Sequence, residues 1–318
     1  MVTALVFVVA MVVSLVVTPL VRHYAHTSGI LDQPDPRKVH TVPIPRLGGI
    51  AMVLAFGVAI GAALIYNADL GELGDVRPNR APAVIVGVAV LFVVGIWDDV
   101  RGMRPLVKLA FQVSAAVAAW WLGLAIDKLV GPWGTVHLDP WLSLLLTVLW
   151  IVAVINAINL IDGLDGLAAG ISLTVLGAFA ILAGREGYDP TLPVIAATAG
   201  AAIGFLAYNL HPASIIMGDT GAMFLGFVIA AIGISLTQDG VVPHPPWVPV
   251  VALGVPILDM IWTVIRRTAS GSPIHVADRG HIHHQLLRRG LSQRDTMLLL
   301  TAVSAGFAVL AVLLGRIV

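Results

Sequence analysis

Long apolar runs alternate with short polar segments along almost the whole chain. About ten of these runs have the ~20 residues that a helix needs to cross the hydrocarbon core of a bilayer. They lie at roughly 2–21, 48–66, 82–97, 106–124, 141–157, 167–183, 191–208, 221–236, 247–264 and 296–315. The pattern therefore predicts an all-α polytopic integral membrane protein with about ten transmembrane helices.

One segment, at about 125–140, interrupts the apolar pattern. Its turn residues, Gly131-Pro-Trp-Gly134, predict a loop or a short re-entrant piece, with an eleventh span as the alternative. The first apolar run has no basic residue before it and no small-residue cleavage site, so we interpret it as a retained helix and not as a signal peptide. We expect residues 1–318 to form one transmembrane domain, in which a cytoplasmic loop at about 265–295 has room for a short amphipathic helix.

Composition supports a membrane protein and excludes several classes of function. Of the residues, 58% are hydrophobic and 11% are charged, whereas a soluble domain carries about 25% charged residues. The net charge is zero, so no overall basic surface indicates a nucleic-acid partner. The chain has no cysteine, which excludes disulfides, thiolate nucleophiles and zinc–thiolate sites.

The distribution of Lys and Arg predicts the orientation in the membrane. If the loop after the first helix is cytoplasmic, the basic residues that fall outside are Arg77, Arg80, Lys128, Arg185 and Arg316. All the others of the 18 Lys and Arg then fall inside, which satisfies the positive-inside rule. Both chain ends are then expected outside, and the polar motifs described next are expected at the cytoplasmic face.

The densest polar stretch is Asn156-Ala-Ile-Asn-Leu-Ile-Asp-Gly-Leu-Asp-Gly166, which lies between two apolar runs. Asp and Asn lower helix propensity and favour caps and turns, and glycine lets a ligand approach the backbone closely. We therefore interpret the stretch as a helix end at the membrane surface. Within it, Asp162 and Asp165 are three residues apart and able to share one face.

Two further acidic motifs fall on the same predicted side. Asp98 and Asp99 follow an apolar helix, and adjacent carboxylates are tolerated best with a cation between them or a shared proton. Mg²⁺ suits such a pair, because it binds through one or two carboxylates together with waters and phosphates. A solvated acidic loop balanced by Arg101 and Arg104 is the alternative. Asp219, between glycines at a helix start, is either an N-cap or a ligand of a metal–diphosphate site.

Basic and histidine-containing motifs complete the set. The motif His281-Ile-His-His284 lacks zinc-site spacing, since its last two histidines are neighbours that cannot share a helix face. It suits contacts to a sugar diphosphate, with a polar surface loop as the alternative. Arg46 lies in a basic inner loop that binds either substrate or lipid headgroups. Lys108 lies one turn inside a span, where a cation needs a carboxylate or a phosphate as its partner.

Taken in order, these motifs resemble those of the polyprenyl-phosphate N-acetylhexosamine-1-phosphate transferases (glycosyltransferase family 4), integral membrane enzymes of bacterial envelope synthesis. The resemblance covers about residues 28–290, and as an ordered set the motifs are highly specific. The segments that carry it are Leu31-Asp-Gln-Pro-Asp35, Arg37-Lys-Val-His40, Pro45-Arg-Leu-Gly-Gly49, Asp98-Asp99, Lys108-Leu-Ala-Phe-Gln112, Asn156 to Gly166, Gly218-Asp-Thr-Gly221 and Arg279-Gly-His-Ile-His-His284.

The resemblance implies transfer of a sugar-1-phosphate from a UDP-sugar to polyprenyl phosphate, with release of UMP and a requirement for Mg²⁺ or Mn²⁺. By motif, Asp98 and Asp99 match the catalytic acidic pair, one of which deprotonates the lipid phosphate. Asp219 matches a metal ligand, with Asn159 near the metal or the diphosphate. The substrate-binding residues implied by the same motifs are Arg46, Lys108, Asn156, Asp162, Asp165, His281, His283 and His284.

Details of the motifs resemble one branch of the family more than another. The branch that uses UDP-N-acetylmuramoyl-pentapeptide usually has three consecutive histidines, whereas Ile282 interrupts them here. Pro45-Arg-Leu-Gly-Gly49 is also closer to the undecaprenyl-phosphate N-acetylglucosamine-1-phosphate transferase branch. We therefore expect UDP-N-acetylglucosamine and undecaprenyl or another polyprenyl phosphate as substrates, in the first membrane step of a cell-envelope polysaccharide. Phospho-N-acetylmuramoyl-pentapeptide transfer is the alternative.

The resemblance also implies a place in the cell. We expect a multi-pass protein of the inner (cytoplasmic) membrane with a cytoplasmic active site, and the family allows a homodimer. A hypothesis from another class is a secondary transporter, for which intramembrane Asp259 and Lys108 are suitable. Transporter sites, however, lie near the bilayer midplane, whereas the acidic motifs here are predicted at helix ends on one side. A metalloprotease is disfavoured because the chain contains no HExxH motif.

Overall fold

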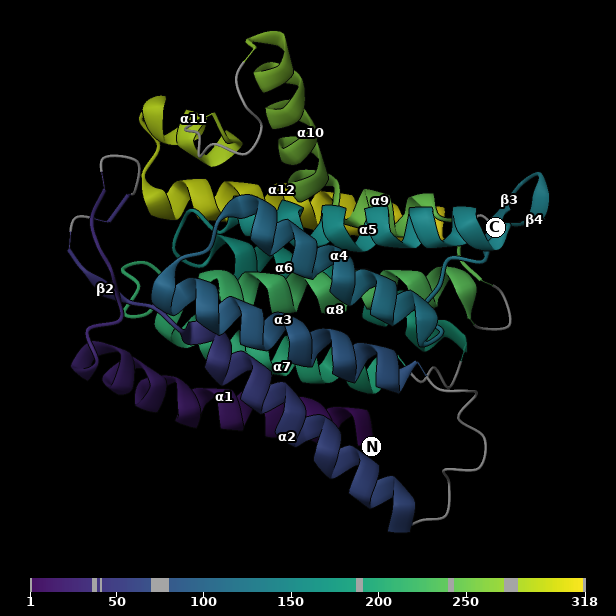
Figure 1. Cartoon of the computed structure of the whole chain (residues 1–318), viewed down its shortest axis with the longest axis horizontal. Helices are drawn as coiled ribbons and strands as arrows, with labels where there is room; N and C mark the ends of the chain where they lie inside the picture. The colour runs from purple at the N-terminus through teal and green to yellow at the C-terminus, as the bar shows by residue number, and fades with distance from the viewer. Residues whose placement is uncertain are drawn as a thin grey trace.

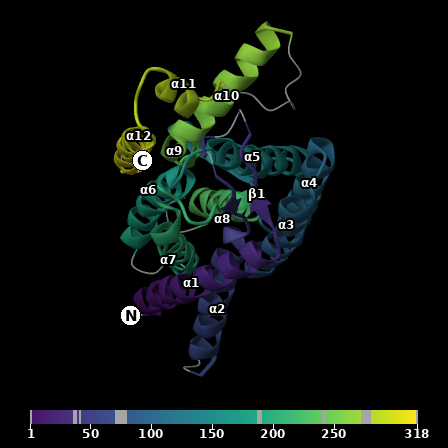
Figure 2. The ribbon, with the colours of Figure 1, turned by 90° about the vertical axis from the view of Figure 1, so that its left-hand side faces the viewer.

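The computed structural model describes residues 2–35, 39–40, 42–69, 80–186, 191–239, 243–271 and 280–316. Three residues of the sequence motifs, Arg37, Lys38 and Arg279, lie outside these ranges. Most of the described chain is helical, as predicted. The long helices run roughly side by side, as Figure 1 shows, and Figure 2 views the same bundle from one end.

Seven helices of the described residues are long and apolar enough to cross a membrane. They are α1 (Val2–Thr27), α2 (Gly48–Asp69), α3 (Ala81–Arg101), α5 (Pro140–Ile161), α7 (Leu192–Asn209), α8 (Gly218–Gln238) and α12 (Gln293–Leu314). Two shorter apolar helices, α4 (Pro105–Trp121) and α6 (Leu167–Ala183), have 17 residues each. Each of these helices overlaps a predicted span, so the polytopic class is confirmed, while the total of about ten spans stays a prediction.

The structure divides the predicted span at 247–264 in two. A short helix, α9 (Trp247–Ala252), is followed by α10 (Gly254–Ala269), which runs across the direction of the other helices in Figure 1. Pro256 contributes to the break, because a proline has no N–H to donate to the carbonyl four residues earlier. The prediction of one continuous helix in this range was therefore wrong.

The segment at 125–140 is a β-hairpin and not an eleventh span. Its strands β3 (Lys128–Gly131) and β4 (Gly134–His137) pair antiparallel. Gln238, the last residue of α8, holds the hairpin in place: its Oε1 accepts from two backbone N–H groups at 3.0 and 3.1 Å. Its Nε2 donates to a backbone carbonyl of the hairpin at 2.9 Å. The loop prediction is thus confirmed, with strands that the sequence analysis did not predict.

Four short elements complete the fold. Strands β1 (Leu31–Asp32) and β2 (Ile44–Pro45) pair antiparallel between α1 and α2. A 3-10 turn, η2 (Gly184–Glu186), follows α6, and α11 (Ile282–Arg288) precedes α12. Helix α11 lies within the range for which a short helix was predicted.

Helix α8 is the centre of the bundle. Each of its residues except Asp219 is buried, as expected for a helix that is apolar all round. Glycines let its neighbours approach closely: a Cβ on Gly49 of α2 would lie 2.1 Å from the backbone nitrogen of Gly221. A Cβ on Gly95 of α3 would lie 2.5 Å from the Cα of Thr220. Small residues at such contacts are typical of membrane helices, and here they fix the first turn of α8 against α2 and α3.

Both described chain ends lie away from the first turn of α8. Helix α1 leads from the N-terminus toward β1, and α12 leads from α11 toward the C-terminus. Figure 1 places the N and C marks at the right-hand ends of these two helices, while α11 and β2 lie at the left. The side of the membrane on which the two ends lie stays a prediction.

Candidate active site

The acidic pair at the end of α3 lies against the first turn of α8. The Asp99 side chain is 0% exposed and accepts hydrogen bonds from the backbone N–H groups of Asp219 (2.8 Å) and Thr220 (3.0 Å). It also accepts one from the Thr220 hydroxyl at 2.6 Å. The first N–H groups of a helix have no intrahelical partner and favour negative charge. Asp99 therefore caps α8 from another helix, and Gly218 leaves the room for it.

Lys108 joins the other two carboxylates of the cluster. Its Nζ lies 3.1 Å from Asp98 Oδ2 and donates a hydrogen bond to Asp219 Oδ1. Asn159 Nδ2 donates to the same Asp219 oxygen at 2.5 Å. Helices α3, α4, α5 and α8 each contribute one of these groups, so motifs far apart in the sequence meet at one point. Of the two kinds of partner expected for Lys108, a carboxylate or a phosphate, the structure shows carboxylates, those of Asp98 and Asp219.

Arg46 lies beside the same acids, in the segment between β2 and α2. Its guanidinium nitrogens lie 3.4 Å from Asp32, 3.6 Å from Asp99 and 4.0 Å from Asp219. Asp32 is buried and its other oxygen lies 3.2 Å from His40 Nε2. Asp32 thus orients Arg46, a role that the sequence analysis missed. The motif that contains Asp32 was the available signal, but spacing alone did not reveal its partner.

The end of α5 provides two residues with different surroundings. The Asn156 side chain donates to Gln112 Oε1 of α4 at 2.7 Å, so it lies between two helices and outside the carboxylate cluster. Asp162 follows α5 and is half-buried. Its burial, and then the nearby negative charges of Asp219 and Asp99, raise the pKa of Asp162 well above the usual range of an aspartate. Asp162 therefore belongs to the electrostatic surroundings of the cluster.

Asp165 faces a different part of the molecule. Its Oδ2 lies 2.8 Å from His211 Nδ1 and accepts from the backbone N–H of Ala213 at 3.1 Å. Asn209, which is buried, accepts from the N–H of Gly166 at 3.0 Å and donates to a carbonyl before α8 at 2.9 Å. These contacts attach the turn after α5 to the α7–α8 loop. Neither Asn209 nor His211 was predicted as a site residue.

Of the three predicted histidines, His283 lies against the turn between α5 and α6, and its ring contacts those of the other two. His281 Nδ1 lies 2.9 Å from Asp259 Oδ2 of α10. His283 is 1% exposed, and a Cβ on Gly163 would lie 2.4 Å from its Nε2. The His283 ring stacks on His281 at 5.8 Å and contacts His284 at 4.3 Å between ring centroids. The histidine loop and the acidic turn, more than 100 residues apart in sequence, therefore share one surface.

His283 is a neutral base in this surface. Burial, followed by the neighbouring rings of His284 and His281, lowers the pKa of His283 to about 3. Neither of its ring nitrogens has a hydrogen-bond partner among the described residues. A buried polar atom without a partner costs about 1–3 kcal/mol. Both nitrogens are buried, so His283 bears this cost without a compensating hydrogen bond among the described residues.

The carboxylate cluster fits a hard divalent cation. Among the described residues, no group of three acidic or histidine side chains is arranged to hold a metal. Mg²⁺ does not need one, because it binds through one or two carboxylates together with waters and substrate phosphates. Asp98 and Asp219 already converge on one cation, the ammonium of Lys108. The amide of Asn159 beside them can turn its oxygen toward a metal. This donor set is compatible with the predicted Mg²⁺ or Mn²⁺.

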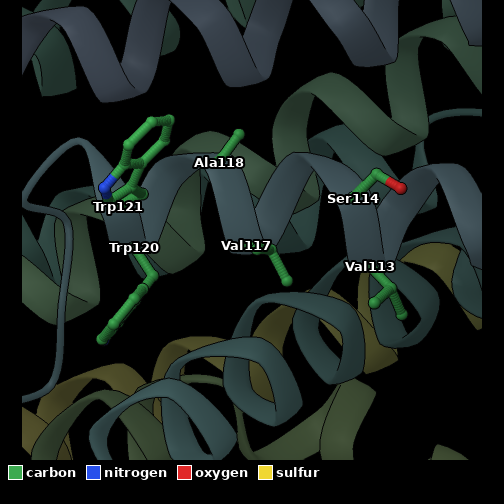
Figure 3. A pocket seen from close by; sticks show the side chains of 6 residues that line it. All are labelled: Val113, Ser114, Val117, Ala118, Trp120 and Trp121. Atoms are coloured by element: carbon green, nitrogen blue, oxygen red, sulfur yellow. The ribbon is translucent and has the colours of Figure 1, made fainter. Parts of the chain in front are cut away.

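An apolar pocket of about 420 Å³ lies on α4, away from the acids. Figure 3 shows the side chains that line it, which are Val113, Ser114, Val117, Ala118, Trp120 and Trp121. No ionisable side chain lines the pocket, so it carries none of the predicted chemistry.

The two intramembrane groups that suggested transport have separate partners. Lys108 contacts Asp98 and Asp219, whereas Asp259 contacts His281. Both sets of contacts lie at the end of the bundle that holds the starts of α8 and α11. A site at one end of the bundle differs from the midplane site of secondary transporters, so the structure favours an enzyme.

Comparison with known proteins adds an independent observation. The model of glycosyl transferase family 4 matches residues 81–237. The chain is 37% identical to a probable undecaprenyl-phosphate N-acetylglucosaminyl 1-phosphate transferase of Bacillus subtilis, over 97% of this chain and 84% of that protein. It is 35% identical to a decaprenyl-phosphate N-acetylglucosaminephosphotransferase of Mycobacterium tuberculosis, over 93% and 78%. A phospho-N-acetylmuramoyl-pentapeptide-transferase of Shouchella clausii is 30% identical, over 97% and 95%.

Proposed function

We propose a reaction for this chain from the premise that it belongs to glycosyl transferase family 4, which the family model and the relatives establish. The chain transfers N-acetylglucosamine-1-phosphate from UDP-N-acetylglucosamine to undecaprenyl or another polyprenyl phosphate and releases UMP. The observation that carries the proposal is the convergence of Asp98, Lys108 and Asp219 at the first turn of α8. The higher identities to N-acetylglucosamine transferases favour this donor over the muramoyl-pentapeptide.

The cationic groups of the site match the anionic substrates. Arg46 and Lys108 lie beside the carboxylates, where they can neutralise the phosphates of donor and acceptor. Asp219, with Asn159 beside it, would hold Mg²⁺, which would supply a Lewis acid for the diphosphate. Phosphoryl transfer otherwise depends mostly on positioning and charge stabilisation. A site built of fixed charges at one end of a bundle meets both requirements.

Asp98 is the better placed base of the acidic pair. Asp99 uses both oxygens to accept three hydrogen bonds from the first turn of α8, which fixes it as a structural anion. Asp98 contacts the flexible side chain of Lys108 instead. In this assignment Asp98 accepts the proton of the lipid phosphate, whose oxygen then forms a bond to the sugar-linked phosphorus of the donor. The bond from that phosphorus to the bridging oxygen breaks, and UMP leaves with the oxygen.

The turn after α5 and the histidine loop form the donor side of the site. Asp162 lies near the cluster, and His283 packs against Gly163 with both ring nitrogens buried and without a partner among the described residues. Neutral imidazole nitrogens are suited to hydrogen bonds with a nucleotide sugar. In this proposal the side that carries the site faces the cytoplasm, where UDP-sugars are made, and both chain ends lie outside; the distribution of Lys and Arg supports this orientation.

UMP release tests the proposal directly. Protein purified in detergent is expected to release UMP only when Mg²⁺, polyprenyl phosphate and UDP-N-acetylglucosamine are all present. Asp98→Asn and Asp219→Asn are expected to reduce the rate by about 100-fold or more, because each removes a charge from the reacting centre. Asp139→Asn, which removes an exposed carboxylate beside the β3–β4 hairpin, is the matched control and should retain activity.

The remaining outcomes separate the alternatives. Release of UMP only with UDP-N-acetylmuramoyl-pentapeptide would show that the chain belongs to the peptidoglycan branch of the family. No release with either donor, from protein shown to be folded, would contradict both donor assignments and return transport to consideration.

A further inference from the structure

We infer that Lys108 is a tethered counter-cation that occupies the place of the divalent metal and leaves Asp219 when the metal binds. The inference deepens the proposed function, because it takes Asp219 as the metal ligand. Lys108 would then have two positions, one on Asp219 without the metal and one away from Asp219 with the metal bound, which the proposed reaction alone does not require.

The contacts of Lys108 resemble those of a bound cation. Its ammonium lies between carboxylates of two other helices, 3.1 Å from Asp98 Oδ2 and in a hydrogen bond with Asp219 Oδ1. The three side chains are only 15%, 9% and 19% exposed, for Lys108, Asp98 and Asp219. Carboxylates withdrawn from water to this extent need a positive charge beside them. Lys108 supplies that charge from within the chain.

A divalent ion and this ammonium cannot share the same oxygen. Asp219 Oδ1 already accepts from Lys108 and from Asn159, which fills the usual acceptor capacity of one carboxylate oxygen. A metal on that oxygen would also lie beside the ammonium, and like charges at such a distance repel strongly in a partly buried site. Binding of the metal through Oδ1 therefore requires the lysine to move away from that oxygen.

The position of Lys108 permits such a movement. It lies in the first turn of α4, close to Pro105, at the end of a flexible four-carbon side chain. It can keep its contact with Asp98 or turn to a substrate phosphate after it leaves Asp219. Arg46 differs, because its contact with buried Asp32 anchors it and its nearest distance to Asp219 is 4.0 Å. Arg46 is therefore the natural comparison within the site.

The exchange couples the metal to the anionic substrates. Without substrate, the metal has to displace a cation that is covalently part of the protein, which weakens metal binding. A bound phosphate gives the released ammonium a new partner, so phosphate and metal should each strengthen the binding of the other. The carboxylates then have a positive charge beside them both without the metal, when Lys108 supplies it, and with the metal bound.

Metal binding in the absence of both substrates tests the inference. Mn²⁺ binding to full-length protein in detergent is measured by isothermal titration calorimetry for Lys108→Met and for Lys108→Gln, whose amide can still hydrogen-bond to the acids. Both variants are expected to bind Mn²⁺ about tenfold more tightly than the wild type, within the usual range of coupling between two sites. Arg46→Met, which also removes one positive charge, should have a smaller effect if displacement and not overall charge is responsible. Lys128→Met, in the β3–β4 hairpin, should have none.

A measurement on the wild type avoids any dependence on how the variants fold. Labelling by an amine reagent, followed by mass spectrometry, should be faster at Lys108 when Mn²⁺ is present, with Lys128 of the same molecule as the internal reference. Mn²⁺ binding that is no tighter in folded Lys108 variants, or labelling of Lys108 that does not increase with Mn²⁺, overturns the inference. Neither measurement uses a donor or an acceptor, so failure of the donor assignment leaves the result readable.

Discussion

At the residue scale, two adjacent aspartates at the end of α3 have different partners. Asp99 accepts three hydrogen bonds from the first turn of α8, whereas Asp98 contacts Lys108. Asp99→Asn replaces an acceptor with an amide donor that faces N–H groups. We expect this variant to lose about 2 kcal/mol of stability, as for a lost helix cap with charge-assisted bonds. Thermal unfolding in detergent measures the loss.

Asp98→Asn is the matched control for this prediction. It removes the same charge one residue earlier and leaves the α8 cap intact, so its melting temperature should stay close to that of the wild type. Both variants should lose UMP release. An equal fall in melting temperature for Asp98→Asn and Asp99→Asn would show that the hydrogen bonds of Asp99 to α8 do not add to stability.

His283 gives a second prediction at this scale, for the dependence of stability on pH. The pKa of His283 is lowered from 6.5 to about 3 in the folded protein. At a pH between these two values, the unfolded chain binds a proton at His283 that the folded chain does not bind. Proton binding therefore favours the unfolded chain, so the folded protein keeps its full stability above about pH 6.5 and loses stability as the pH falls toward 3. The loss is at most about 1.4 kcal/mol per pH unit. His283→Gln should reduce the slope of melting temperature against pH below about 6.5.

The exposed His137 of the β3–β4 hairpin provides the comparison. His137→Gln removes a histidine at the other end of the molecule and should keep the wild-type slope. If the two variants change the slope equally, the folded protein does not hold His283 in its neutral form.

The sequence predicted most of the ionisable residues that the structure brings together, because charge is rare in this chain and each motif was conspicuous. It did not predict the partners. Asp32, Asn209 and Asp259 act through contacts with residues far away in the sequence, namely with Arg46, Gly166 and His281 in that order. Such pairings depend on how helices pack, and spacing along one segment carries no information about them.

At the element scale, the site depends on how closely helices approach the first turn of α8. Gly49 of α2 leaves no room for a side chain, because a Cβ would lie 2.1 Å from the backbone nitrogen of Gly221. We expect Gly49→Ala to force α2 away from α8 and to lower stability by about 1–3 kcal/mol or more, as for overpacked cores. The displacement should also lower UMP release, since Arg46 precedes α2 by two residues.

Gly57 of the same helix is the control. A Cβ on Gly57 would meet nothing within 4 Å, and alanine is the better helix former by about 1 kcal/mol. Gly57→Ala should therefore be neutral or stabilising in thermal unfolding. A similar loss for both substitutions would mean that helix propensity, and not the close contact, decides the effect.

Apolar periodicity predicted the long helices well, since length and hydropathy are properties of a single segment. It failed where geometry depends on a break. The range 247–264 is apolar apart from Asp259 and Thr263, yet the chain turns between α9 and α10. Gly254 and Pro256 were the available signals, but both residues also occur within continuous membrane helices, so their presence alone does not predict a break.

At the scale of the whole molecule, the site and both described chain ends lie at opposite ends of the bundle (Figure 1). This arrangement makes the orientation in the membrane a test of function, because UDP-sugars are cytosolic. The excess of Lys and Arg in the loops on the site side predicts that this side is cytoplasmic. The count of spans follows only in part from the sequence, since the predicted span at 247–264 includes much of α10, which does not run along the bundle.

Cysteine labelling measures this orientation, and the chain is suited to it because it contains no cysteine. Thr135→Cys, exposed in the β3–β4 hairpin, should react with a membrane-impermeant maleimide in intact cells. Arg289→Cys, exposed after α11 on the site side, should react only after the membrane is permeabilised. The parent chain, which should stay unlabelled, is the control. The reverse pattern would place the carboxylate cluster outside, where a cytosolic nucleotide sugar cannot reach it, and the proposed reaction would then fail whatever the chemistry of the site.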